Sequence, residues 1–231
     1  MILNLAAYRF VAIDDVDALV LQLRAQLSSA GVRGTVLVAP EGINLVLAAQ
    51  AGALRGFADT LLADPRFAGM ALKWSESAFV PFRKLLVKAK RETITFRQTG
   101  LDPASARAPA VDPPTLARWL ARGADDHGRE IALIDTRNQQ ETAFGSFAEA
   151  ITLPISKFTE LPEALEAHRA ELSGKTVVSF CTGGIRCEKA AIWMQQAGYG
   201  DVLQLEGGIL AYFEQVGGFA YRDRCFVFDE R

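Results

Sequence analysis

One stretch of the sequence constrains the fold more than any other: an apolar strand, a compact loop and a helix follow one another directly. The strand is predicted over 175–180, which reads KTVVSF and is rich in β-branched residues. The loop CTGGIR occupies 181–186, and a helix is predicted over 188–197 with Gly198 at its end. A buried strand that passes through a loop into a helix is typical of a parallel α/β sheet.

The loop has the composition of a reactive site. Its two glycines allow backbone N–H groups to converge on one point, and the start of a helix adds positive potential there. Arg186 adds a fixed charge. We therefore expect Cys181 to have a lowered pKa and to stand as thiolate, the reactive form. The alternative is a buried structural cysteine beside a phosphate-binding turn, and the C-x-x-x-x-R spacing between strand and helix argues against it.

The loop resembles the active loop of rhodanese-like domains, whose first cysteine carries a persulfide. The longer segment 182–190, TGGIRCEKA, resembles the signature of the rhodanese-domain tRNA uridine hydroxylases, which make 5-hydroxyuridine at the wobble position. The resemblance implies catalytic roles for Cys181 and Arg186, and molecular oxygen as co-substrate. It places these residues in the active loop: Thr182, Gly183, Gly184, Ile185 and Cys187. Cys187 can be interpreted as a resolving thiol or as a small packed residue.

The first part of the chain predicts a ferredoxin-like α+β domain. Strands are expected over 3–13, 34–39, 43–47 and 70–75, and helices from the caps Asp14 and Asp15 to about 29 and over 50–63. The segment 34–44, GTVLVAPEGIN, resembles the most recognisable part of the same family's N-terminal domain. Its functional interpretation is a surface near RNA. Its structural interpretation, in which Gly42 serves backbone geometry and Asn44 satisfies backbone groups, is favoured from the residues alone.

A basic segment follows the last of these predicted strands, within the same domain. Five basic residues lie within nine positions: Arg83, Lys84, Lys88, Lys90 and Arg91. The alternation from Val87 predicts a strand with Lys88 and Lys90 on one face. With the aromatic residues Phe79 and Phe82 nearby, these side chains suit phosphate contacts and base stacking in a tRNA partner. A solvated edge strand, whose lysines prevent edge pairing, explains the same pattern equally well.

The expected domain organisation is an N-terminal ferredoxin-like domain over 1–97, a linker over 98–114, a rhodanese-like α/β domain over 115–221 with its core at 127–221, and a tail over 222–231. The linker is rich in Pro, Ala, Gly and Asp and lacks periodicity. Asp135 ends a strand predicted over 130–135 and Arg137 follows it, and we expect them to form an ion pair that supports the loops. Further along the chain, a helix is predicted around 161–170 and a turn over 206–208.

Composition limits the remaining classes. The net charge is −2, so contact with nucleic acid requires a local basic patch. Three cysteines form no disulfide framework, which favours a reducing compartment. No apolar run approaches membrane-spanning length and no signal-peptide pattern is recognised, so a cytoplasmic, non-membrane location is expected. No cofactor motif or stable protein partner is indicated. No metal is expected, because neither His127 nor His168 has a partner at ligand spacing. Many relatives continue past the final CFVFD segment into a cysteine-rich tail, so this is either a short member or a trimmed chain.

Four functions compete on the sequence. The first is an oxygen-dependent tRNA uridine hydroxylase, and the second is a plain sulfurtransferase that passes a persulfide sulfur from Cys181 to an acceptor. The third, a cysteine phosphatase, is disfavoured because the loop has four residues between Cys181 and Arg186 where phosphatase loops have five. The fourth, a binding module with an inactive rhodanese domain, is disfavoured because both residues are present. The hydroxylase is favoured, because it also accounts for the N-terminal domain and its basic segment.

Overall fold

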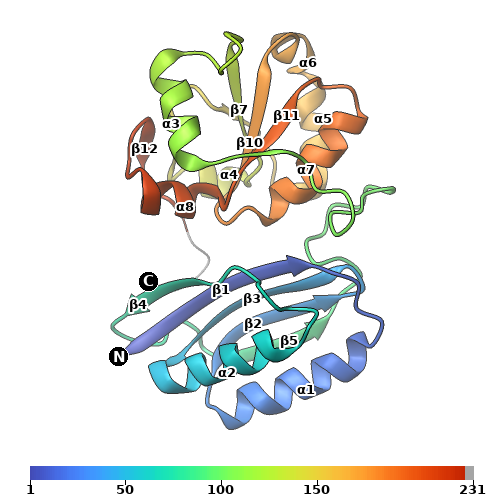
Figure 1. Ribbon diagram of the computed structural model, residues 1–231, viewed down its shortest axis with the longest axis vertical. Coiled ribbons are helices and arrows are strands. Elements are labelled where there is room, and N and C mark those ends of the chain that lie inside the picture. The colour runs from blue at the N-terminus through green and yellow to red at the C-terminus, as the bar shows by residue number, and fades with distance from the viewer. Residues whose placement is uncertain (227–231) are drawn as a thin grey trace. The chain divides into compact units, whose positions relative to one another are not determined.

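The computed structural model describes residues 1–226 and divides into two compact units, Met1–Thr95 and a second unit that begins at Phe96 (Figure 1). Within the described residues, no helix combines the length and apolar character needed to cross a bilayer. The part of the predicted tail from residue 227 onward lies outside the described residues.

The first unit has the predicted βαββαβ order. Its elements are β1 (Ile2–Phe10), α1 (Val16–Ser29), β2 (Arg33–Ala39), β3 (Gly42–Gln50), α2 (Ala51–Ala63), β4 (Lys73–Ser77) and β5 (Leu85–Ala89). The strand order is β4-β1-β3-β2-β5, with β5 parallel to β2 and the other pairs antiparallel. This arrangement confirms the ferredoxin-like prediction, and β5 extends the sheet by one edge strand.

The core of this unit lies between the sheet and its two helices, which pack on the same face of the sheet (Figure 1). Leu19, Leu23 and Leu27 line the buried side of α1, as their helical spacing predicts. The expected side-chain caps of this helix are absent, because Asp15 makes no capping bond and instead pairs with Arg66. Gly42 has φ +151°, and a Cβ there would lie 2.1 Å from the Arg9 carbonyl oxygen, so this turn requires glycine.

The second unit is a parallel α/β structure, as predicted. Its strands are β6 (Ala110–Val111), β7 (Ile131–Asp135), β8 (Gly145–Phe147), β9 (Ile151–Thr152), β10 (Thr176–Phe180), β11 (Val202–Leu205) and β12 (Tyr221–Asp223). Its helices are α3 (Pro113–Arg122), α4 (Gln139–Thr142), the 3₁₀ turn Phe158–Glu160, α5 (Leu161–Glu166), α6 (Arg169–Leu172), α7 (Ile185–Gln196) and α8 (Gly208–Gln215). The main sheet has the order β6-β11-β10-β7-β9, and all of its pairs are parallel.

Three local features differ from what the sequence analysis gave. The helix after the active loop begins at Ile185 rather than at residue 188, because Gly184 adopts a left-handed conformation (φ 101°) and starts the helix. The helix predicted around 161–170 is two short helices, α5 and α6, separated at His168. The two-stranded sheet formed by β8 and β12 was not predicted, because each strand has only three residues.

The segment predicted as a linker packs on the second unit. Phe96 is fully buried, and its ring stacks on Phe158 with 4.4 Å between the centroids. Within 98–114, strand β6 pairs with β11, and the Asp112 carboxylate accepts a hydrogen bond from the Thr115 N–H at the start of α3. These residues therefore contribute to the core of the second unit.

Candidate active site

The site lies where β10 passes into α7, at the carboxyl end of the central strand of the parallel sheet. The Cys181 side chain is almost fully buried, with 1% exposed. The Gly184 N–H donates a hydrogen bond to its sulfur at 3.1 Å. Because Gly184 is also the N-cap of α7, the sulfur lies against the positive end of the helix.

The environment of Cys181 favours the thiolate. Burial raises the pKa of the thiol, but a hydrogen bond from Cys187, the charge of Arg186 and the backbone N–H groups of Arg186 and Gly184 outweigh burial and lower the pKa to about 5. At neutral pH the sulfur is therefore an anion held by fixed donors. This is the state required of a sulfur nucleophile or a persulfide carrier.

Cys187 lies in the first turn of α7 and is fully buried. Burial raises the pKa of its thiol well above the usual value, and the Cys181 sulfur, as hydrogen-bond partner and as charge, raises it further. The Cys187 sulfur also lies 3.7 Å from the Thr136 hydroxyl. Cys187 is thus a packed, protonated thiol that donates to the Cys181 thiolate. Its role as a resolving thiol stays a prediction.

Arg186 is held by a residue that the sequence analysis did not single out. Its Nη1 and Nη2 atoms donate to the two carboxylate oxygens of Glu141 at 2.6 and 2.7 Å. The Glu141 side chain is fully buried, and it also accepts hydrogen bonds from the Asn138 N–H at 3.1 Å and the Thr182 hydroxyl at 3.4 Å. The capping-box spacing from Asn138 to Glu141 was a sequence signal for a hydrogen-bonded carboxylate at the start of α4, but not for its pairing with Arg186.

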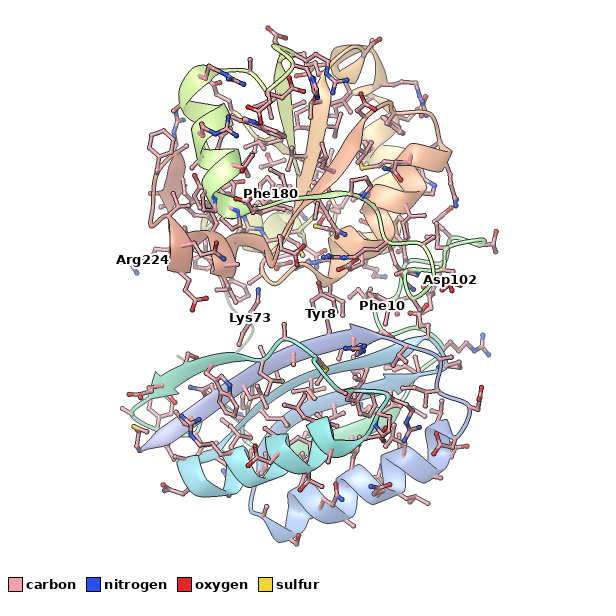
Figure 2. All side chains as sticks on the ribbon, viewed as in Figure 1. Tyr8, Phe10, Lys73, Asp102, Phe180 and Arg224 are labelled. Carbon is pink, nitrogen blue, oxygen red and sulfur yellow. The ribbon has the colours of Figure 1, made fainter. Side chains whose placement is uncertain are left out.

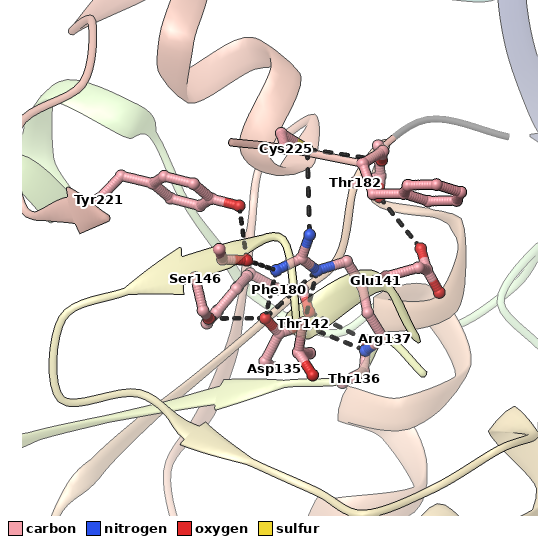
Figure 3. Close-up of polar contacts among 12 residues, drawn as sticks. Asp135, Thr136, Arg137, Glu141, Thr142, Ser146, Phe180, Thr182, Tyr221 and Cys225 are labelled. Carbon is pink, nitrogen blue, oxygen red and sulfur yellow. Dashed lines mark hydrogen bonds and ion pairs between the residues drawn. The ribbon is translucent and has the colours of Figure 1, made fainter. Parts of the chain in front are cut away.

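Asp135 and Arg137 form the expected ion pair, and both side chains are fully buried. Arg137 Nε donates to the Asp135 carboxylate at 2.9 Å, and Arg137 Nη2 donates to the Gly145 carbonyl oxygen at 2.7 Å. Figure 3 shows this arginine between Asp135, Ser146 and Cys225; the Ser146 hydroxyl donates to Asp135 at 2.7 Å. The pair therefore joins the end of β7 to the two-stranded sheet of β8 and β12.

A second support comes from the start of α8. The Ile209 and Leu210 N–H groups donate to the carbonyl oxygens of Cys181 and Thr182 at 3.0 and 3.1 Å. A Cβ at Gly208 would lie 2.4 Å from the Cys181 carbonyl oxygen, so only glycine permits this approach. The Gly-Gly pair at 207–208, interpreted from the sequence as a turn, thus also holds the active loop.

The remaining predicted residues fall into two groups, one in the active loop and one in the first unit. Gly183 and Ile185 complete the loop, with Ile185 as the first residue of α7. The basic residues belong to the first unit: Lys88 is in β5, Arg83 and Lys84 precede it, and Lys90 and Arg91 follow it. All five side chains are exposed. Among residues 1–226, no group of three His, Cys, Asp or Glu side chains has a geometry that could hold a metal ion.

Comparison with known proteins covers both units. A family model described as UPF0176 acylphosphatase like domain matches residues 2–93, and a model described as Rhodanese-like domain matches residues 116–215. A protein from Xanthomonas euvesicatoria pv. vesicatoria named tRNA uridine(34) hydroxylase is 58% identical over 231 residues, which is 100% of this chain and 93% of the relative. Proteins of the same name from Variovorax paradoxus and Cupriavidus necator are 60% and 55% identical over 230 residues and are covered to 88% and 82%. The likeness therefore extends across the whole chain.

Proposed function

The chain belongs to the tRNA uridine(34) hydroxylase family, and we propose that it hydroxylates the wobble uridine of tRNA at C5 with molecular oxygen as co-substrate and Cys181 as the reacting residue. The observation that carries the role of Cys181 is its sulfur at 3.1 Å from the Gly184 N–H, in a loop that lowers the pKa of the thiol to about 5. Since tRNA is the substrate and the three cysteines are free, we place the enzyme in the cytoplasm.

The geometry supports two uses of the Cys181 thiolate. It can add to C6 of uracil, which raises the electron density at C5, where the hydroxyl group is introduced. It can also carry a second sulfur atom as a persulfide. In both cases the fixed donors stabilise the Cys181 thiolate before it reacts. Arg186 remains oriented because Glu141 accepts a hydrogen bond from each of its two terminal nitrogens.

The function is tested by mass spectrometry of tRNA from cells that lack this protein. We expect 5-hydroxyuridine at the wobble position to be lost, and to return when the wild-type gene is supplied. The Cys181→Ser variant should not restore it, because a serine hydroxyl stays protonated at neutral pH. Cys225→Ser is the matched control and should restore it, since Cys225 contacts the structural Arg137 and has a raised pKa caused chiefly by burial. Restoration by Cys181→Ser would refute the assigned role.

The second candidate is a sulfurtransferase, which the rhodanese-like match over 116–215 favours. It predicts transfer of sulfur from thiosulfate through Cys181 to a small acceptor. It also predicts unchanged 5-hydroxyuridine in the deletion strain. Measuring both products with the same purified protein separates the two functions, and a protein that transfers sulfur without forming 5-hydroxyuridine would exclude the hydroxylase.

A further inference from the structure

The sheet of the first unit has one face that its helices leave uncovered. The side chains that alternate toward α1 and α2 form the core, including Leu3, Leu5 and Ala7 of β1. The intervening residues Tyr8 and Phe10 therefore lie on the opposite face, and both are partly exposed. Figure 2 shows Tyr8 and Lys73 on the side of this sheet away from the two helices.

The strand register places aromatic and basic side chains in the same cross-strand rows. Tyr8 of β1 is opposite Asn44 of β3, Asn44 is opposite Leu37 of β2, and Leu37 is opposite Lys88 of β5. With strands about 4.8 Å apart, Tyr8 and Lys88 are separated by three strand spacings, or about 14 Å.

The next row also has an aromatic residue at its β1 end and a lysine at its β5 end. Phe10 is opposite Gly42, and Gly42 is opposite Ala39. The Lys90 N–H continues the ladder to the Val38 carbonyl oxygen at 2.8 Å, so Lys90 lies at the β5 end of this row. Gly42 and Ala39 in the middle of this row are buried, whereas Phe10 at one end is partly exposed and Lys90 at the other is exposed.

The two rings and the lysines form one surface. The Tyr8 and Phe10 ring centroids are 6.1 Å apart with 70° between the ring planes, so the rings present separate faces. Lys88 and Lys90 lie at the β5 edge, and Lys73, opposite Ala6, lies on β4 at the other edge. Lysines therefore border the aromatic rings on both sides, in a chain whose net charge is −2.

We propose that this face binds unpaired nucleotides of the tRNA anticodon loop, with bases stacked on Tyr8 and Phe10 and phosphates held by Lys88 and Lys90. Single-stranded RNA is recognised through base stacking on aromatic rings and cationic contacts to its backbone, and open sheet faces provide both. Two partly exposed rings on the sheet, with ammonium groups at its edges, fit this ligand. The proposal rests on the proposed function, since it assigns a contact surface for the same tRNA substrate.

The test is titration of a labelled anticodon stem-loop RNA with the full-length protein at several salt concentrations. Tyr8→Ala and Phe10→Ala should each weaken binding about tenfold, with an unchanged slope of log affinity against log salt, because stacking releases no counterions. Lys88→Ala and Lys90→Ala should each make the slope shallower by about 0.7, the value for one phosphate of a single strand. Tyr8→Phe retains the ring and should bind as the wild type does.

Phe219→Ala is the matched control, since it removes an exposed ring from the second unit, and it should leave binding unchanged.

A measurement on the wild type avoids any effect of substitutions on folding. RNA with 5-iodouridine in its loop should cross-link, on irradiation, to the peptide that contains Tyr8 and Phe10. Wild-type affinity of both alanine variants, together with cross-links that all lie elsewhere, would overturn the proposal. If the wild-type protein still forms 5-hydroxyuridine, those two results would reject the RNA-binding role of this surface but not the proposed function. Absence of 5-hydroxyuridine from the wild-type reaction would reject the proposed function.

Discussion

The carboxylate of Glu141 accepts hydrogen bonds from Nη1 and Nη2 of Arg186, at 2.6 and 2.7 Å, and the Glu141 side chain is fully buried. This pair fixes the plane of the arginine at the first turn of α7, beside the Cys181 sulfur. Arg186 thus acts as an oriented charge rather than as a freely moving one, and this has consequences for stability as well as for reactivity.

Glu141→Gln should lower the free energy of unfolding by about 3 kcal/mol, because removing one charge of a buried pair leaves the other uncompensated. Urea denaturation followed by circular dichroism measures the change. The control is Glu166→Gln, which breaks a similar two-bond pair with Arg169 on the surface, where water screens both charges. We expect a much smaller effect there, and equal losses in the two variants would contradict the importance of burial at Glu141.

The lowered pKa of Cys181 predicts how its alkylation depends on pH. Because the thiolate is the reactive form, the rate with iodoacetamide should rise through about pH 5 and level off before neutrality. The pKa of Cys225 is raised, chiefly by burial, so alkylation at Cys225 should rise only above its ordinary range near 9. Mass spectrometry of the separate cysteine peptides distinguishes these profiles in one sample.

Arg186→Lys should shift the alkylation midpoint of Cys181 to higher pH and remove most of the hydroxylase activity. Lysine keeps the charge, but it cannot make the paired hydrogen bonds with Glu141 that orient the guanidinium. Rates of alkylation across the range about pH 4 to 9 give the midpoint. An unchanged midpoint would mean that Arg186 does not tune the Cys181 thiol.

The basic segment of the first unit can be tested as a whole. Replacing Lys84, Lys88, Lys90 and Arg91 with Ala should weaken tRNA binding and flatten the salt dependence by about 0.7–0.9 for each lost phosphate contact. Arg55→Ala, which removes a cation from α2, is the control and should leave the slope unchanged. Alkylation of Cys181 should not change in either protein. Superimposable binding curves would show that the segment is only a solvated edge strand, an interpretation that its place at the sheet edge also permits.

The packing of residues 96–114 predicts the boundary of the second domain. A fragment that begins at Phe96 should fold and accept sulfur on Cys181 without modifying tRNA, whereas one that begins at Thr115 should be clearly less stable. The shorter fragment loses the Asp112 cap of α3, which is worth about 1 kcal/mol, and buried Val111, worth at least about 1.5 kcal/mol. Thermal unfolding of the two fragments measures the difference, and identical melting temperatures would return the boundary to residue 115.

The sequence by itself determined the features that depend on near neighbours. The apolar run before Cys181, the glycines after it and the helix beyond predict a thiolate loop, because each acts over a few residues. The apolar periodicity of the first unit likewise predicts its βαββαβ order, since one buried face specifies the spacing of each strand and helix. The signature at 182–190 identifies the family from contiguous residues.

Only the tertiary structure decided which residues hold that loop. Glu141 is 45 positions before Arg186, and Gly208 meets Cys181 from the start of another helix. Neither pairing has a local pattern, because both result from parallel strands that bring their carboxyl ends to one edge of the sheet. The same holds for Tyr8 and Lys88, which are 80 positions apart in the numbering and share a row through the pairing of four strands. Local composition specifies the reactive group, whereas strand order and register specify its supports.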